Sequence, residues 1–454
     1  MNKYFFWFLI GLISFVVVQD TYQAIACSIA IIIFSELLLK SHQQFAFREW
    51  ALLLYAMNYL VAPAITYNLP DNDVQYEMKI LSDQYFELAI PGFLCFFIGM
   101  FVFKTKIFKI DFTQVNLSAS VNEKFLIQLT LLGTILNLIN IFIQGELNFI
   151  IYLFAILRFV GAFALFSLNK KNWIWVFVVL IIELTRAFLG GLYHDALMWV
   201  VFFTLFFVYA HKPSFQTKII GFIALAFLVL FVQAIKVTYR NEVWQGNQDA
   251  SLETVFIVGS KQANSNVLIG TDNLLSTLNR GNQAWIFAST VENMDKNKNF
   301  QGLTNVNKYL EAAILPRFLA PNKIQSGDKE IFNIFSGHEI NEGTSMGLGI
   351  FADGYIAFGT WGVYLFGFVF GLIFSLTFKL VDRWTKVSPF YVLLLLPLLN
   401  YAVRPDCELQ TTINHLFKGI LLYGFLVYLT RKRFTLDSLE NQRKLLHLNL
   451  AFKK

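Results

Sequence analysis

The feature that most constrains this chain is a repeated run of apolar residues, each long enough to cross a lipid bilayer. About 20 helical residues span the hydrocarbon core, and windows of roughly that length recur along the sequence. Only 15% of the residues are charged, whereas a soluble domain averages about 25%. We therefore predict an all-α integral membrane protein with about twelve transmembrane helices, near residues 4–19, 21–39, 49–67, 87–103, 125–143, 149–168, 173–190, 195–210, 219–236, 357–378, 388–403 and 413–430.

Basic residues in the loops predict how these helices are oriented. Lys and Arg concentrate in every second loop, and the short loops between carry almost none. By the positive-inside rule, the basic loops and both termini face the cytoplasm. The residues that set this orientation are Lys40, Arg48, Lys104, Lys106, Lys109, Lys170, Lys171, Lys212, Lys218, Lys379, Arg383, Lys386, Arg431, Lys432 and Arg433.

One long polar segment interrupts this pattern and suggests the domain organisation. Residues 237–345 contain apolar residues at helix-like spacings, in LETVFIVGSKQANSNVLIG, GNQAWIFASTVENM and NVNKYLEAAILPRFLAP. A long structured loop among short connections is usually functional. We predict an N-terminal transmembrane bundle over 1–236 with about nine spans, this large periplasmic loop over 237–345, about three further spans over 346–430, and a basic cytoplasmic tail over 431–454.

Several ionisable residues lie within or beside the predicted spans, where charge is costly and usually functional. All of them except Arg158 map to the outer half of the membrane or to its surface. Each also has a plain structural explanation, because such groups form local ion pairs, cap helices or extend to lipid headgroups. The residues are Arg158, Glu183, Arg186, His194, Asp195, Arg240 and Arg404.

The shared side of these charges favours an anionic, lipid-linked ligand. Guanidinium groups suit pyrophosphate because they bind its oxygens in pairs and stay protonated. We take Arg186, Arg240, Arg280 and Arg317 as candidate pyrophosphate-binding residues. The sequence has no CxxC, HExxH or histidine cluster, so we expect no metal and no other cofactor. The arginines would then stabilise a departing pyrophosphate without magnesium.

The stretch NEGTSMGLGIFADGYIAFGTWG, residues 341–362, places glycines and two acids where the polar segment meets a span. Non-helical backbone at membrane depth is tolerated only inside protein or against a polar cavity. We predict a broken helix or re-entrant turn here. Gly367 and Gly371 are spaced for close helix packing. The glycines that would permit the break are Gly343, Gly347, Gly349 and Gly354.

With AILPRFLAPNK just upstream, this region resembles bacterial O-antigen or oligosaccharide repeat-unit polymerases of the Wzy type. Those proteins carry an I-P-R-x-L-x-P-x-K-like stretch, a T-S-x-G segment and a G-E-x-Y-x-x-F-G-x-x-G-like run before a late span. LTRAFLGG around Arg186 also looks like their Arg-Gly span. The acid of the third run is Asp353 here, where the family often has Glu. The matching residues are Pro316, Arg317, Pro321, Lys323, Thr344, Ser345, Tyr355, Phe358, Gly359 and Gly362.

The resemblance implies a C-type glycosyltransferase-like membrane fold in the bacterial inner membrane. It also implies transfer of a growing glycan from undecaprenyl pyrophosphate to the terminal sugar hydroxyl of a fresh repeat unit. The implied partners are undecaprenyl-pyrophosphate-linked oligosaccharides, a flippase and a chain-length regulator, with membrane lipids around the protein and no nucleic acid.

Such a transfer needs a base near the acceptor hydroxyl and cations at the leaving group. His338, Glu342 and Asp353 are the available bases, and the residues alone do not choose among them. Lys323 and Tyr355 are candidate ligands for pyrophosphate or sugar. Three alternatives stay open: an O-antigen ligase, a lipid-linked oligosaccharide flippase or other transporter, and a scaffold in a polysaccharide assembly complex.

Overall fold

The computed structural model describes residues 20–41, 43–69, 76–120, 122–143, 146–168, 172–190, 193–244, 251–262, 265–315, 319–320, 323–324, 329–340 and 346–434. Within these ranges the chain is helical and contains no β-strand. The predicted all-α class is therefore confirmed for the described part of the chain.

Seven of the described helical segments are long and apolar enough to cross a membrane, so the chain has the character of a multi-pass membrane protein. They are Thr21–Lys40, Glu123–Phe142, Leu147–Leu168, His194–His211, Phe215–Lys236, Ile350–Thr385 and Leu409–Phe434. The total of twelve spans stays a prediction. The first predicted span, 4–19, lies outside the described residues. The predicted windows 87–103 and 173–190 fall in the continuous helices Ser82–Met100 and Trp173–Gly190, which are not among these seven, whereas 49–67 is divided and 388–403 forms a shorter helix.

The helices follow one another as α2 (Thr21–Lys40), α3 (Phe47–Ala56), the π-helix η1 (Met57–Val61), α4 (Ala62–Thr66), α5 (Ser82–Met100), η3 (Ile107–Lys109), α6 (Phe112–Ser120), α7 (Glu123–Ile139), η4 (Asn140–Phe142), α8 (Glu146–Ala155), α9 (Leu157–Leu168), α10 (Trp173–Gly190) and α11 (Tyr193–His211). They continue as α12 (Phe215–Trp244), α13 (Leu252–Gln262), α14 (Ser265–Leu268), α15 (Thr271–Arg280), α16 (Ala284–Asn297), α17 (Thr304–Ile314), α18 (Lys329–Ser336), α19 (Ile350–Thr385), η6 (Pro389–Leu394), α20 (Leu395–Leu399) and α21 (Leu409–Phe434).

The predicted span 49–67 is helical but divided, and proline chemistry explains why. Pro63 lacks the N–H that would bind the Tyr59 carbonyl four residues earlier, and a π-helical turn, η1, lies at this point. The Tyr85 hydroxyl of α5 donates to that carbonyl at 2.9 Å. The divided helix is thereby fixed against α5 through a backbone group that the proline leaves free.

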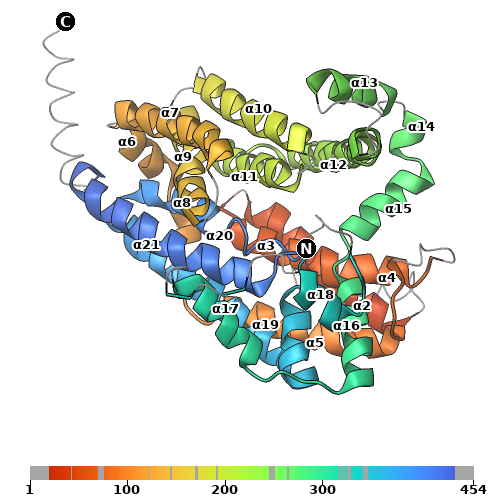
Figure 1. Ribbon diagram of the computed structural model, residues 1–454. Coiled ribbons are helices and arrows are strands. Elements are labelled where there is room, and N and C mark those ends of the chain that lie inside the picture. Colours follow the sequence, from red (N-terminus) through yellow and green to blue (C-terminus); the bar gives the residue numbers. More distant parts are fainter. Residues whose placement is uncertain are drawn as a thin grey trace, which may run out of the picture.

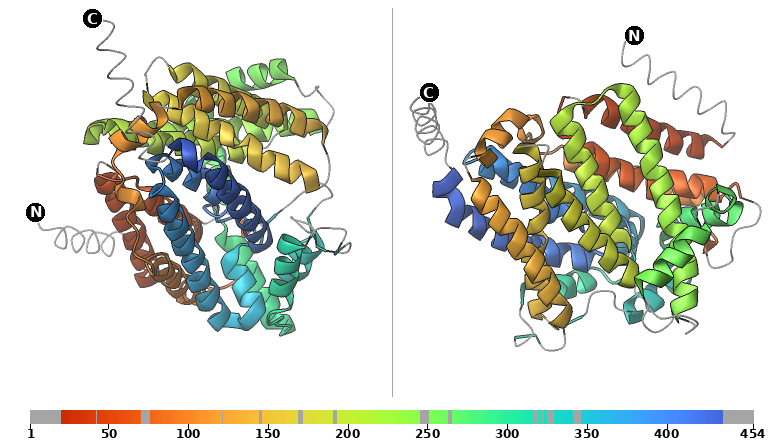
Figure 2. Two further views of the ribbon diagram at one scale, coloured as in Figure 1. Left: turned by 90° about the vertical axis from the view of Figure 1, so that its left-hand side faces the viewer. Right: turned by 90° about the horizontal axis from the view of Figure 1, so that it is seen from above.

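Two parts of the chain far apart in sequence form the centre of the bundle. Figures 1 and 2 show α6 to α12 on one side, with the N-terminal helices α2 to α5 lying beside α16 to α19 on the other. Helix α5 packs tightly on α19 because Gly99 and Gly371 face each other: a Cβ on Gly371 would come within 2.2 Å of the Phe96 carbonyl oxygen. The predicted packing role of Gly371 is thus confirmed.

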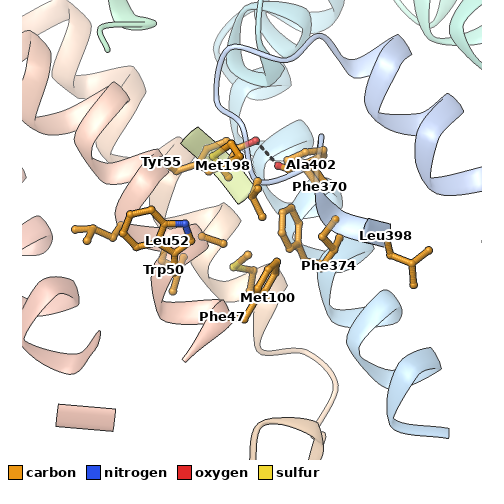
Figure 3. Close-up of a cluster of buried hydrophobic side chains, with 14 of the residues drawn as sticks. Phe47, Trp50, Leu52, Tyr55, Met100, Met198, Phe370, Phe374, Leu398 and Ala402 are labelled. Atoms are coloured by element: carbon orange, nitrogen blue, oxygen red, sulfur yellow. Dashed lines mark hydrogen bonds between the residues drawn. The ribbon is translucent and has the colours of Figure 1, made fainter. Parts of the chain in front are cut away.

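Aromatic side chains fill the space around this contact. Tyr55 of α3 lies 4.6 Å from the Phe96 ring of α5, and Phe96 lies 5.9 Å from Phe370 of α19. Figure 3 shows Tyr55 and Phe370 in this core, together with Met198 of α11. The Tyr55 hydroxyl donates to the Ala402 carbonyl at 3.0 Å. The apolar core therefore also holds the polar loop that follows α20.

Described basic loops meet at one end of the bundle, as the charge pattern predicts. Hydrogen bonds join the loop after α2 to the loop after α5 and to the start of α12, and others join the end of α5 to the end of α19. These bonds run from Phe45 N to Phe108 O (2.8 Å), from Lys218 Nζ to Leu38 O (2.9 Å), from Phe103 N to Ser375 Oγ (2.9 Å) and from Lys106 N to Asp382 Oδ1 (3.2 Å). We call this the basic end; that it faces the cytoplasm stays a prediction.

The long segment predicted as an outer loop is mostly helical where it is described. Helix α12 continues beyond its apolar part to Trp244, and α13 to α18 follow, including helices in all three stretches with helix-like spacing. Helix α16 packs on α19, and α17 packs on α21. This segment therefore covers the ends of α19 and α21 that lie away from the basic end. The domain boundaries remain predictions.

Helix α19 is broken within the predicted stretch 341–362, but at Phe358 and Gly359 and not at any of the four glycines named for the break. Phe358 and Gly359 have non-helical dihedral angles, with φ 61° and ψ −142° at Gly359. That combination is essentially confined to glycine. The chain turns back there so sharply that Gly354 and Gly362 touch, and a Cβ on Gly362 would collide with the Gly354 carbonyl oxygen. The short first part of α19 is thereby separated from the long apolar part and carries Asp353.

Candidate functional site

Asp353 lies in the first turn of α19 and is only 6% exposed. Its Oδ1 accepts a hydrogen bond from the Tyr309 hydroxyl of α17 at 3.1 Å, and its Oδ2 accepts one from the Leu409 N–H at the start of α21 at 3.4 Å. A buried carboxylate whose described partners are a phenol and one backbone amide is costly. This placement makes Asp353 the strongest functional candidate among the predicted residues.

A small pocket opens beside Asp353, with room for about one water molecule. Its polar side chains come from α17, from the first part of α19 and from the start of α21. Glu408, which accepts a hydrogen bond from the Thr411 hydroxyl at 2.6 Å, is a second carboxylate at this pocket. The lining residues are Tyr309, Ile331, Phe332, Met346, Leu348, Asp353, Glu408 and Gln410.

The glycine-rich segment before α19 lets two backbones meet next to this pocket. Gly349 has φ 80°, and a Cβ there would lie 2.4 Å from the Tyr59 hydroxyl and 3.1 Å from the Pro405 carbonyl oxygen. The side chain of Gln283, just before α16, donates to the Gly347 carbonyl at 2.7 Å. These close approaches place the first turn of α19, and with it Asp353, against the loop that follows α20.

That loop, residues 400–408, carries a buried arginine. Arg404 is 7% exposed, its Nη1 lies 2.5 Å from Asp195 Oδ1 of α11, and its Nε donates to the Asn400 carbonyl at 2.9 Å. Burial opposes the charged form, but the Asp195 carboxylate outweighs that effect, and the pKa of Arg404 is raised above its ordinary value. Two residues later, Asp406 Oδ2 lies 3.7 Å from His194 Nδ1. The loop therefore links the surroundings of Asp353 to Asp195 and His194 of α11.

A second buried ion pair lies between α9 and α10. Arg158 is 1% exposed; its Nη2 lies 2.5 Å from Glu183 Oε2, and its Nη1 donates to the Ala155 carbonyl at 3.1 Å. Arg186 contacts the same Glu183 at 3.4 Å and the Asn137 side chain at 3.4 Å. Because one carboxylate serves two arginines, this cluster keeps one net positive charge. Arg186 is its accessible member, with 34% of the side chain exposed.

The remaining predicted residues are dispersed. His338 Nε2 lies 2.9 Å from the Ser289 hydroxyl, and burial, followed by the charge of Lys79, lowers the pKa of His338 below its usual value. Tyr355 donates to Asp295 Oδ1 at 2.8 Å. Lys323 donates to the Leu315 carbonyl at 2.8 Å. No hydrogen bond or ion pair between described residues joins any of these side chains to Asp353.

Several predicted residues cannot be placed in this site. Arg280 is exposed at the end of α15, and Arg240 lies on α12. The side chain of Arg240 and the whole of Arg317 and Glu342 lie outside the described residues, as do the motif positions Pro316, Pro321, Gly343, Thr344 and Ser345.

Sequence reasoning missed Tyr309, Asn400, Asp406 and Glu408. Tyr309 carries no signal of its own, because a tyrosine in an amphipathic stretch usually packs in a core. The loop did carry a signal, since RPDCE places three charges between two apolar segments. Only its arginine was singled out, as a residue at the end of a span.

The sequence matches the domain of unknown function DUF8712 over residues 43–384. The chain belongs to this family. No curated protein and no solved structure matches it. The matched region of the DUF8712 family contains Asp353, Asp195 and the Arg158–Glu183–Arg186 cluster, and it ends before the loop that carries Arg404 and Glu408.

Proposed function

We propose that this protein is a membrane glycosyltransferase that polymerises oligosaccharide repeat units carried on undecaprenyl pyrophosphate. The observation that carries the proposal is Asp353: a buried carboxylate on a broken helix, at a pocket, held by one phenol and one backbone amide. The resemblance of the surrounding motif to repeat-unit polymerases supports the same activity. The bacterial inner membrane, a flippase that delivers the repeats and a chain-length regulator belong to this proposal.

In the proposed reaction, a sugar hydroxyl of the acceptor repeat attacks the anomeric carbon of the donor glycan. The bond from that carbon to the pyrophosphate oxygen breaks, and undecaprenyl pyrophosphate leaves with the electron pair. The hydroxyl proton passes to the Asp353 carboxylate, which acts as general base. Tyr309 and the Leu409 N–H fix the two carboxylate oxygens, so the base is oriented before the acceptor binds.

Arg186 is the described arginine best suited to the leaving pyrophosphate. Arg404 and Arg158 are each buried against a carboxylate, which neutralises most of their charge toward a ligand. Arg186 shares its carboxylate with Arg158 and is partly exposed, and its two contacts at 3.4 Å are long. A pyrophosphate oxygen offers shorter, charge-assisted bonds to the same guanidinium. Arg404 and Asp195 then act by positioning the loop that contacts Asp353.

The test is a gel of surface glycolipid from a strain that lacks the gene. We expect loss of the polymer ladder with single-repeat glycolipid retained. Complementation with Asp353→Asn should leave the ladder absent at wild-type protein levels, whereas Asp272→Asn, at an exposed position on α15, should restore it. An unchanged ladder in the deletion strain contradicts the proposal. Polymer stranded on the lipid carrier would indicate a ligase, and loss of all surface glycan a flippase.

A further inference from the structure

A second concave site lies far from Asp353, between the long part of α19 and α21. It has a volume of about 390 Å³, which is within the range of small-molecule sites. Ile373, Leu376, Leu380 and Ile420 form its apolar wall, and Lys379 and Arg383 line it as well. We call it the α19–α21 groove. It takes no part in the function proposed above.

The two cations of the groove have no carboxylate partner among the described residues. Lys379 Nζ lies 4.3 Å above the ring of Phe103, a contact that leaves its charge uncompensated. Arg383 is exposed. The neighbouring acid, Asp382, instead accepts the backbone N–H of Lys106 at 3.2 Å, and this contact holds the loop that follows α5. An uncompensated pair of cations beside an apolar wall is complementary to a ligand with an anionic head and an apolar tail.

The position of the groove indicates where such a ligand would come from. Both α19 and α21 are long and apolar enough to cross a membrane, and Leu376 on the groove wall is 47% exposed. Residues 373–383 lie about 20–35 Å along the helix from the break at Gly359. The groove is therefore at the basic end, about one membrane thickness from Asp353. A lipid lying beside α19 at that depth would have its acyl chains along the apolar wall and its headgroup near the cations.

We propose that the α19–α21 groove binds an anionic phospholipid. One acyl chain lies against Leu376, Leu380 and Ile420, and the phosphate is held by Lys379 and Arg383. A second copy of this chain fits poorly, because its corresponding surface carries the same positive charge. A zwitterionic lipid lacks the net negative charge that the two cations favour.

Binding here would join the two helices that also form the candidate active site. Asp353 lies on the first part of α19, and its Oδ2 accepts the N–H of Leu409, the first residue of α21. A ligand that binds only the folded protein raises its thermal stability in proportion to the logarithm of ligand concentration. An anionic lipid should therefore stabilise the whole chain, and its effect should be lost when the groove cations are removed.

The experiment uses the full-length protein, purified in detergent and freed of lipid. Phosphatidylglycerol or phosphatidylcholine is added, bound lipid is counted by native mass spectrometry, and the unfolding temperature is followed. We expect phosphatidylglycerol to bind and raise the unfolding temperature, and phosphatidylcholine to do neither. Lys379→Gln with Arg383→Gln should weaken phosphatidylglycerol binding roughly 30-fold, since each cation near an anionic headgroup contributes on the order of a factor of five.

Two further variants keep the test decisive. Arg431→Gln with Lys432→Gln removes two exposed cations near the end of α21, outside the groove, and should leave binding unchanged. Leu376→Trp fills the groove without changing its charge and should also weaken binding. Equal binding by the groove double variant and the wild type would overturn the proposal. Equal binding of phosphatidylglycerol and phosphatidylcholine would also overturn it. The same holds if undecaprenyl phosphate displaces phosphatidylglycerol when the two are present at equal concentration.

Discussion

The two ends of the bundle differ in how much of their charge is exposed. Near Asp353, charge is buried: the Asp353 side chain is 6% exposed, and Arg404 of the adjoining loop pairs with Asp195. At the basic end, Lys40 and Arg48 pair with the buried Glu49, but other cations, such as Arg383 and Lys386, are exposed. Burying a charge is expensive, and removing one partner of a buried pair leaves the other charge uncompensated. Exposed, unmatched charge fixes the orientation of a chain in a membrane and attracts anionic lipid.

Removing one member of a buried pair should destabilise the protein most. Arg158→Ala leaves Glu183 buried against only the long contact from Arg186, and we expect a loss of about 3–5 kcal/mol of unfolding free energy. The measurement is the unfolding temperature and the yield of folded protein in detergent.

The matched control replaces both partners. Arg158→Met with Glu183→Met removes the two charges together and should recover most of the stability, since a buried ion pair and an apolar pair of similar volume are often equivalent. An Arg158→Ala protein as stable as the wild type would show that the Arg158–Glu183 pair is not desolvated in the folded protein.

The break in α19 gives the next largest effect. Gly359→Ala places a side chain on a residue with φ 61° and ψ −142°, and we expect it to cost about 1–3 kcal/mol. Gly221→Ala is the control, because Gly221 lies in α12 and a methyl group there would meet no described atom of another helix within 4 Å. Alanine is favoured there by about 0.5–1 kcal/mol. A Gly359→Ala protein of wild-type stability would mean that the helix is continuous.

Arg186 distinguishes a ligand contact from a structural ion pair. Arg186→Lys keeps the charge but loses the paired donors that suit phosphate, so we expect activity to fall at least about tenfold. Stability should change little, because the side chain is partly exposed. Polymerisation rates and unfolding temperatures measured together separate the two roles. Full activity in Arg186→Lys would mean that Arg186 only pairs with Glu183 and does not bind pyrophosphate.

The smallest effect is a pH dependence at His338. Because the folded protein lowers the pKa of His338, it disfavours protonation relative to the unfolded chain, whose histidine has a pKa of about 6.5. The neutral His338 therefore stabilises the folded protein at pH values above about 6.5. This stabilisation is lost as the pH falls toward the lower pKa of His338 in the folded protein. His338→Gln should therefore flatten the fall in unfolding temperature on acidification.

The basic end could be predicted from sequence because it depends on the Lys and Arg residues of individual loops, which can be recognised without knowing the tertiary structure. Each Lys or Arg in a loop contributes to orientation independently of tertiary structure, and the Gly367–Gly371 spacing needs only a helix to become a packing face. The break in α19 was predictable for the same reason, since glycines permit it, although its position at Gly359 depends on Gly354 and Gly362 packing together.

The candidate site could be predicted only in part. Asp353 was found because an acid among glycines beside a span is unusual. Tyr309 and Glu408 were not found, because they reach Asp353 only when α17 and α21 pack together, from positions 44 residues before and 55 after it. The pairing of Arg404 with Asp195 also joins distant segments, whereas Glu183 and Arg186 are one helical turn apart and their contact was foreseeable.

The role of Asp353 as general base is tested most directly by the rate of polymerisation by purified protein supplied with lipid-linked repeat units. Wild type, Asp353→Asn and the Asp272→Asn control are compared at equal amounts of folded protein. If Asp353 is the base, Asp353→Asn should be slower by a factor of about 10²–10⁴ while repeat-unit binding and unfolding temperature stay close to wild type. An Asp353→Asn rate within twofold of the wild type would contradict this role.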